Sequence, residues 1–228
     1  MVKKGSSWRW AIALGLVAAL SGAGLVAAAP DVLRAALGYR VAIDLVVTSQ
    51  LSPRVLALLK SEVDRIWAPY GIAFAWNGAG EDVEERRRLA IADSETDRPQ
   101  ASAAHTALAW IWFESPTRPG HEIQASVDAA RRLVGAVKLG GRSPKAFPGI
   151  EETLLGRALG RSVAHEVGHF LLASPHHSDA GLMRALFLPD DLLRFDEDDY
   201  ALNPAEQRSL TTRTGPRPTS GSGDPLGN

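Results

Sequence analysis

The spacing of apolar residues changes from strand-like to helix-like along the chain. Residues 39–48 are rich in β-branched side chains, which predicts a strand. After Ser52 and Pro53, a good cap and a good first-turn residue, apolar positions recur at helical spacing up to Trp67. The same reasoning predicts strands at 72–76, 107–113 and 122–127, the last near the edge of the sheet, and a short helix at 128–137.

The longest helical pattern covers residues 150 to about 173. Glu151 and Glu152 lie in its first turn, where acidic side chains favour the helix dipole. Pro175 is expected to end the helix. A last short helix is predicted at 204–210.

Two stretches show no clear regular spacing of apolar residues. Residues 81–104 are charged, rich in alanine and interrupted by Pro99, so we expect a partly helical, exposed segment whose charges form a solvated face. Residues 140–149 contain three glycines and two prolines, which indicates a long loop.

The two ends of the chain differ in composition from the segments between them. Basic residues precede an uncharged apolar run from Trp10 to Ala29, which closes in small residues. This pattern predicts that residues 1–30 are a signal peptide or an N-terminal membrane anchor, and that the protein is secreted, periplasmic or anchored facing outward. Residues 215–228 are rich in Gly, Ser and Pro, which predicts a disordered tail.

Composition narrows the chemistry. With 228 residues and 45% apolar residues the chain can bury one sizeable core. A net charge of -1 gives no basic field for nucleic-acid binding. Because the chain has no cysteine, a metal could be held only by His, Asp or Glu.

The predicted long helix contains His165-Glu166-Val167-Gly168-His169. Histidines four residues apart lie on one face of a helix, one turn apart, where both can hold one ion. Zinc accepts neutral imidazole nitrogen, and Glu166 beside the first ligand is suited to take a proton from the attacking water. We therefore predict Zn²⁺ as the cofactor, with His165 and His169 as ligands and Glu166 as the catalytic base.

A catalytic zinc needs a third ligand and an open position. His176-His177-Ser178-Asp179 follows Pro175, where the chain must turn. His177 is our first choice for this ligand. His176 and then Asp179 are the alternatives.

The segment from His165 to Met183 resembles the metzincin clan of zinc peptidases, and the matrixin pattern in particular. The resemblance rests on the motif from His165 to His169, on His177-Ser178 and on Gly181-Leu182-Met183. It implies that His165, His169 and His177 bind zinc, that Glu166 is the general base and that Met183 belongs to a Met-turn beneath the metal. The chain departs from the clan pattern in two places: the expected glycine is Leu172, and the expected third histidine is Pro175, so the spacing to His177 is two residues longer.

Three further expectations concern side chains near the motif. Arg157 and Arg161 lie eight and four residues before His165, and we expect them to point outward and pair with acids such as Asp196 to Asp199. A role for Arg161 with a substrate carboxylate is the alternative. Trp110 and Trp112 are expected to serve packing or to line a cleft.

Taken together, the sequence predicts an α+β zincin domain, metzincin-like, at residues 37–214, with a mixed twisted sheet over the active-site helix. The expected function is zinc-dependent endopeptidase activity on a peptide or protein bound as an extra strand. The alternative is a catalytically inactive, zinc-stabilised extracytoplasmic binding or structural module.

Overall fold

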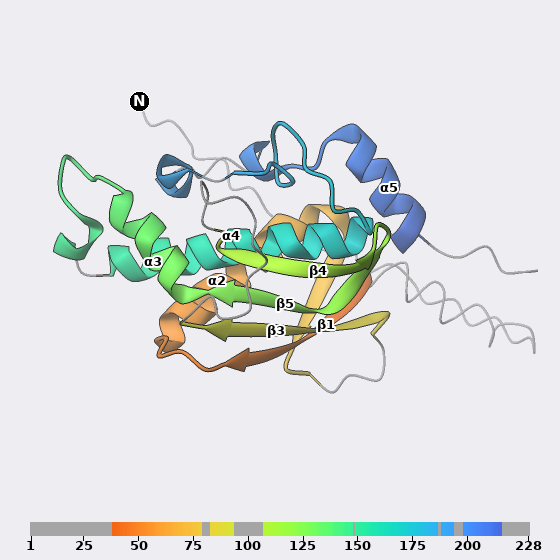
Figure 1. Ribbon diagram of the computed structural model, residues 1–228, viewed down its shortest axis with the longest axis horizontal. Helices are drawn as coiled ribbons and strands as arrows, with labels where there is room; N and C mark the ends of the chain where they lie inside the picture. The colour runs from red at the N-terminus through yellow and green to blue at the C-terminus, as the bar shows by residue number, and fades with distance from the viewer. Residues whose placement is uncertain are drawn as a thin grey trace, which may run out of the picture.

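The computed structural model describes residues 38–78, 83–93, 107–147, 149–186, 188–193 and 198–215. Within these ranges the protein is α+β, with one five-stranded mixed sheet and four α-helices (Figure 1). The predicted leader at 1–30 and the predicted tail from 216 onward lie outside the described residues. No helix within the described ranges has the length and hydropathy of a membrane span.

The sheet has the strand order β2-β1-β3-β5-β4. Strand β1 (Tyr39–Val47) pairs in parallel with β2 (Ile72–Trp76) and β3 (Glu85–Ala92), and β3 pairs in parallel with β5 (Arg118–Ser126). Strand β4 (Ala109–Ser115) pairs with β5 antiparallel and forms one edge of the sheet.

One prediction about the strands is wrong. The charged stretch from residue 81 contains β3 instead of a helix, because Arg87, Leu89 and Ile91 alternate into the core. Strand β5, predicted near the edge of the sheet, lies next to the edge strand β4, and its Ile123 and Ala125 are buried. Residues 81–82 and 94–104 of the charged stretch lie outside the described residues.

Helix α2 (Pro53–Trp67) begins as its sequence predicts. The Ser52 hydroxyl accepts a hydrogen bond from the Val55 amide, and Pro53 occupies the first turn. The predicted apolar stripe is buried, from Val55 and Leu59 to Trp67. Helix α3 (Val127–Ala136) also forms close to the predicted range.

Helix α4 (Ile150–Leu172) is the centre of the molecule. It packs against α2, α3, β4 and β5, and α5 (Pro204–Thr214) packs on it from the side away from the sheet (Figure 1). Two glycines allow α2 to approach: a Cβ at Gly156 would lie 2.5 Å from the Leu58 Cβ, and one at Gly160 2.7 Å from the Glu62 Cβ. This close contact holds α4 against α2.

Helix α4 ends close to the predicted position, but a left-handed residue closes it instead of Pro175. The helix ends at Leu172, and Ala173 closes it in the left-handed conformation, with φ of 47°. Its amide donates to carbonyls of the last turn, at His169 and Phe170. A left-handed residue at this position is the usual way to end a helix, so the turn comes two residues before Pro175.

Candidate metal centre

Three histidines converge on one point at the C-terminal end of α4. His165 and His169 lie on the helix, and His177 lies on the loop that follows it. The His169 Nε2 is 3.0 Å from the His165 Nε2 and 3.2 Å from the His177 Nε2. One ligand atom from each of the three residues lies within 4.8 Å of the others, so the cluster could hold a metal ion.

Backbone carbonyls orient the two helix histidines. The His165 Nδ1 lies 2.7 Å from the Leu182 carbonyl oxygen, and the His169 Nδ1 lies 2.7 Å from the Ser174 carbonyl oxygen. Because a carbonyl can only accept, each Nδ1 carries the hydrogen and each Nε2 presents a lone pair to the shared point. Metal-binding histidines are typically held in this way.

Burial keeps both helix histidines neutral. It lowers the pKa of His165 to about 3 and that of His169 to about 4. Burial also lowers the pKa of His177, although this side chain is exposed on the other side of the cluster. At neutral pH all three imidazoles are therefore in the form that binds a metal.

The donor set fits zinc. Zinc–nitrogen bonds of about 2.0–2.1 Å in a tetrahedral shell place neighbouring nitrogens about 3.3 Å apart, close to the two distances found here. Three neutral imidazoles are a zinc-type ligand set, and the exposed position of His177 leaves one side of the cluster facing solvent.

The alternatives for the third ligand are separate from this cluster. His176 and Asp179 flank His177 on the same loop and are both exposed, but neither belongs to the cluster within the described residues. The structure thus brings together the three histidines that the resemblance implies.

Glu166 is buried beside the cluster, with 8% of its surface exposed. Burial raises the pKa of its carboxyl to about 8, although a backbone hydrogen bond with Ile111 of β4 acts in the opposite direction. A carboxyl whose pKa lies near neutrality can both take and return a proton. The bond to Ile111 ties this carboxyl to the edge strand.

Strand β4 passes along the cluster. The Phe113 ring meets the His169 ring edge-on, with centroids 6.3 Å apart. Trp110 is buried, as expected for a packing residue, whereas Trp112 between these positions is 48% exposed. An edge strand with exposed and aromatic side chains therefore borders the histidines.

Met183 lies under the last turns of α4. It is 1% exposed, and its Sδ is so close to Gly168 that a Cβ at that position would overlap it. Gly168 is the residue between Val167 and His169, so the methionine packs directly against the helical turn that carries His169. The carbonyl of its neighbour Leu182 is the acceptor for His165.

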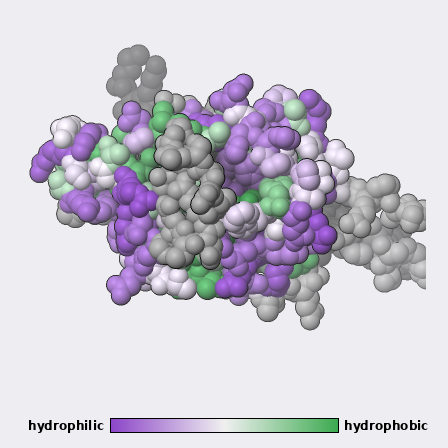
Figure 2. Space-filling model, in the orientation of Figure 1, coloured by the Kyte–Doolittle hydropathy of each residue, from purple (hydrophilic) through white to green (hydrophobic). Residues whose placement is uncertain are grey.

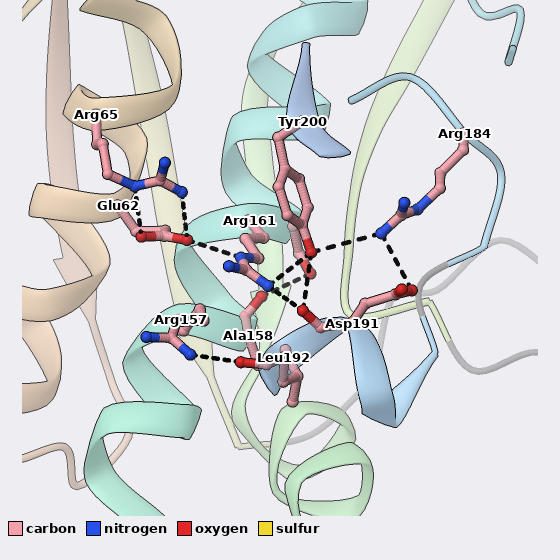
Figure 3. Close-up of polar contacts among 10 residues, drawn as sticks. Glu62, Arg65, Arg157, Ala158, Arg161, Arg184, Asp191, Leu192 and Tyr200 are labelled. Atoms are coloured by element: carbon pink, nitrogen blue, oxygen red, sulfur yellow. Dashed lines mark hydrogen bonds and ion pairs between the residues drawn. The ribbon is translucent and has the colours of Figure 1, made fainter. Parts of the chain in front are cut away.

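The expectation for the two arginines is wrong for Arg161. This side chain is 2% exposed and points into the molecule, where its Nε donates to the Glu62 carboxylate of α2 at 2.7 Å. Its Nη1 donates to the Tyr200 hydroxyl at 2.6 Å and to the Asp191 carbonyl (Figure 3). Arg157 is half-buried and donates to the Leu192 carbonyl. A fully desolvated guanidinium needs such partners, so Arg161 is a structural residue rather than a substrate ligand.

Several groups that shape the site have no signal in the sequence. The carbonyls of Leu182 and Ser174 and the backbone of Ile111 act whatever their side chains are. Glu62 lies 99 residues before Arg161 in an otherwise ordinary helix. Only the fold brings them together.

No protein-family model matches the chain, and a search of curated proteins finds no significant match.

Proposed function

We propose that the protein is a zinc-dependent peptidase of the metzincin type. The observation that carries this proposal is the convergence of the His165, His169 and His177 Nε2 atoms next to a buried Glu166. A zinc ion held by these atoms would lower the pKa of water and polarise a peptide carbonyl.

Glu166 would move the proton. Its carboxylate takes a proton from the attacking water and later delivers it to the nitrogen of the leaving amine. The raised pKa of the buried carboxyl belongs to the metal-free site. A zinc cation held by the histidines would lower this pKa, and the carboxylate form that takes the proton would then be favoured. The backbone bond from Ile111 would keep the carboxylate in place during both transfers.

The edge strand supports a peptide substrate. Among the described residues, strand β4 is hydrogen-bonded to β5 on one side only, and its Phe113 lies against His169. An extended peptide could add to its free side as a further strand and run past the histidines. The order of elements supports the metzincin-like form of the fold, and so does the buried turn around Met183 (the methionine turn) under the helix.

A catalytically inactive zinc module is the second candidate. A structural zinc site is closed by four protein ligands. The position of His176 outside the cluster, and the exposed side at His177, favour the open site of an enzyme instead.

The test is the Glu166→Gln variant. It keeps the size of the side chain but cannot carry the proton, so we expect the variant to bind zinc as the wild type does and to lose at least about 100-fold in turnover of a peptide library. Asp179→Asn changes an exposed acid on the loop that carries His177. This variant is the control and should keep full turnover. Equal turnover in wild type and Glu166→Gln would refute the mechanism.

We also propose that the protein acts outside the cytoplasm, on the strength of the apolar run that follows the basic N-terminus.

A further inference from the structure

His177 is held differently from the other two histidines. His165 and His169 are buried on a helix and bonded to carbonyls, whereas His177 is exposed on a loop. Among the described residues its Nδ1 makes no hydrogen bond, and its Nε2 faces His169. The position of this imidazole must therefore be set by the backbone of its own loop.

Ser178, the next residue, is the anchor of that loop. Its amide donates to the Met183 carbonyl at 2.8 Å, which closes the turn from the histidine back to the methionine. Its hydroxyl donates to the Glu206 carboxylate and accepts from the Asn203 side-chain amide at 3.1 Å. With a donor and an acceptor bond made, the hydroxyl has one fixed orientation.

Both partners of the hydroxyl belong to the start of α5. Asn203 is the N-cap, and its Oδ1 accepts from the amides of Ala205 and Glu206 at 2.8 and 3.0 Å. In return the backbone N–H of Asn203 donates to the Glu206 Oε2 at 2.8 Å, so the two residues form a capping box. The cap bonds assign the Asn203 Oδ1, which leaves its Nδ2 to donate to Ser178. Glu206 divides its two carboxylate oxygens between the cap and the loop.

We propose that the capping box of α5 positions the third metal ligand, with Asn203 and Glu206 acting through Ser178 on His177. The inference rests on the proposed function, since it requires that the three histidines bind a metal. Asn203 and Glu206 do not touch the metal in this account. They are positioning residues that hold the only loop-borne ligand at the distance that the two helix ligands require.

The experiment measures Co²⁺ affinity of the full chain, followed by the visible absorption of the bound ion. We expect Ser178→Ala and Glu206→Ala each to weaken binding about 10-fold or more, as changes in residues that orient a ligand commonly do. Ser178→Ala leaves the capping box intact, so its effect does not depend on the stability of α5. Ser178→Thr, which keeps the hydroxyl, should restore the affinity and the spectrum.

The decisive comparison uses the His177→Ala background. If Glu206 acts through His177, adding Glu206→Ala to His177→Ala should lower the Co²⁺ affinity no further. Glu152→Ala is the matched control, because Glu152 accepts a 2.6 Å hydrogen bond from Ser52 at another helix start. This control should leave the affinity of the wild type unchanged.

The outcomes separate this inference from the function on which it rests. Unchanged Co²⁺ affinity in Ser178→Ala and Glu206→Ala would overturn the positioning role alone, and so would an equal loss in the His177→Ala background. A wild-type chain that binds no Co²⁺ or Zn²⁺ would overturn the proposed function and this inference with it.

Discussion

Single residues at the end of α4 place the groups that contact the histidines of this helix. Ala173 adopts a left-handed conformation that costs an L-residue about 1 kcal/mol. The turn it makes carries the Ser174 carbonyl back to the His169 Nδ1. Gly168, in turn, gives Met183 the space to lie against the same helical turn.

Replacing Ala173 with glycine tests the first of these costs. Glycine adopts the left-handed conformation without steric strain, so we expect the free energy of unfolding to rise by up to about 1 kcal/mol. Ala57→Gly, on the exposed side of α2, should lower it by about 1 kcal/mol. Urea unfolding of both variants gives the comparison, and a loss in Ala173→Gly as large as in Ala57→Gly would contradict the strain.

A pH dependence follows from the buried Glu166. Its carboxyl has a pKa of about 8 in the folded protein against an ordinary value of 4.5, so the folded state holds a proton that the unfolded state releases. The neutral carboxyl therefore favours folding fully below pH 4.5, and this contribution is lost as the pH rises through 8.

Glu166→Gln removes this titration. With a chelator present, we expect the variant to gain stability relative to wild type between pH 5 and pH 8, by an amount on the order of a few kcal/mol. Urea unfolding at the two pH values measures the difference. The same difference at both values would show that Glu166 is not held protonated in the fold.

At the scale of elements, a buried ionic network joins α4 to its neighbours. Arg161 of α4 binds Glu62 of α2 and Tyr200 of the C-terminal segment, and Arg184 beside the methionine turn binds the Asp191 carboxylate at 3.1 Å (Figure 3). Burial alone would raise the pKa of Glu62, but hydrogen bonds from Arg65 and Arg161 lower it below its ordinary value. The network fixes the segments on which the methionine turn rests.

Removal of one partner should therefore be costly. We expect Arg161→Ala to lower the free energy of unfolding by about 2–3 kcal/mol, because Glu62 and the Asp191 carbonyl lose the guanidinium, although Glu62 keeps Arg65 and the carbonyl keeps the Tyr200 hydroxyl. Arg54→Ala breaks an exposed pair with Glu152 and should cost less than about 0.5 kcal/mol. Thermal and urea unfolding of the two variants, at one pH and salt concentration, measures both losses. Equal losses of stability would contradict the network.

At the scale of the whole molecule, the parts predicted from the sequence are those with local causes. Helices α2 and α4 follow from caps and apolar spacing, and the pairing of His165 with His169 follows from their spacing of four residues. The charged residues of strand β3 obscure its period of two, so its sequence predicts an exposed, partly helical segment instead. The pairing of Arg161 with Glu62, and of Ser178 with Glu206, depends on contacts across 99 and 28 residues, which no local pattern encodes.

The described residues on the face drawn in Figure 2 are largely hydrophilic, and apolar residues show in several places on it. Among the described residues, the large apolar side chains with much exposed surface include Trp112 on the edge strand and Leu186 and Leu188 beyond the methionine turn. Scattered exposed apolar residues of this kind are normal on folded proteins.

The metal content of the purified chain tests the central claim most directly. Mass spectrometry or elemental analysis should find one zinc ion per chain in the wild type, a loss of that ion in His177→Ala, and full occupancy in His176→Ala. The reason is that, among the described residues, His177 belongs to the cluster and His176 does not. Zinc that survives His177→Ala but is lost in His176→Ala would contradict the assigned third ligand. A chain that binds no zinc at all would contradict the metal centre itself.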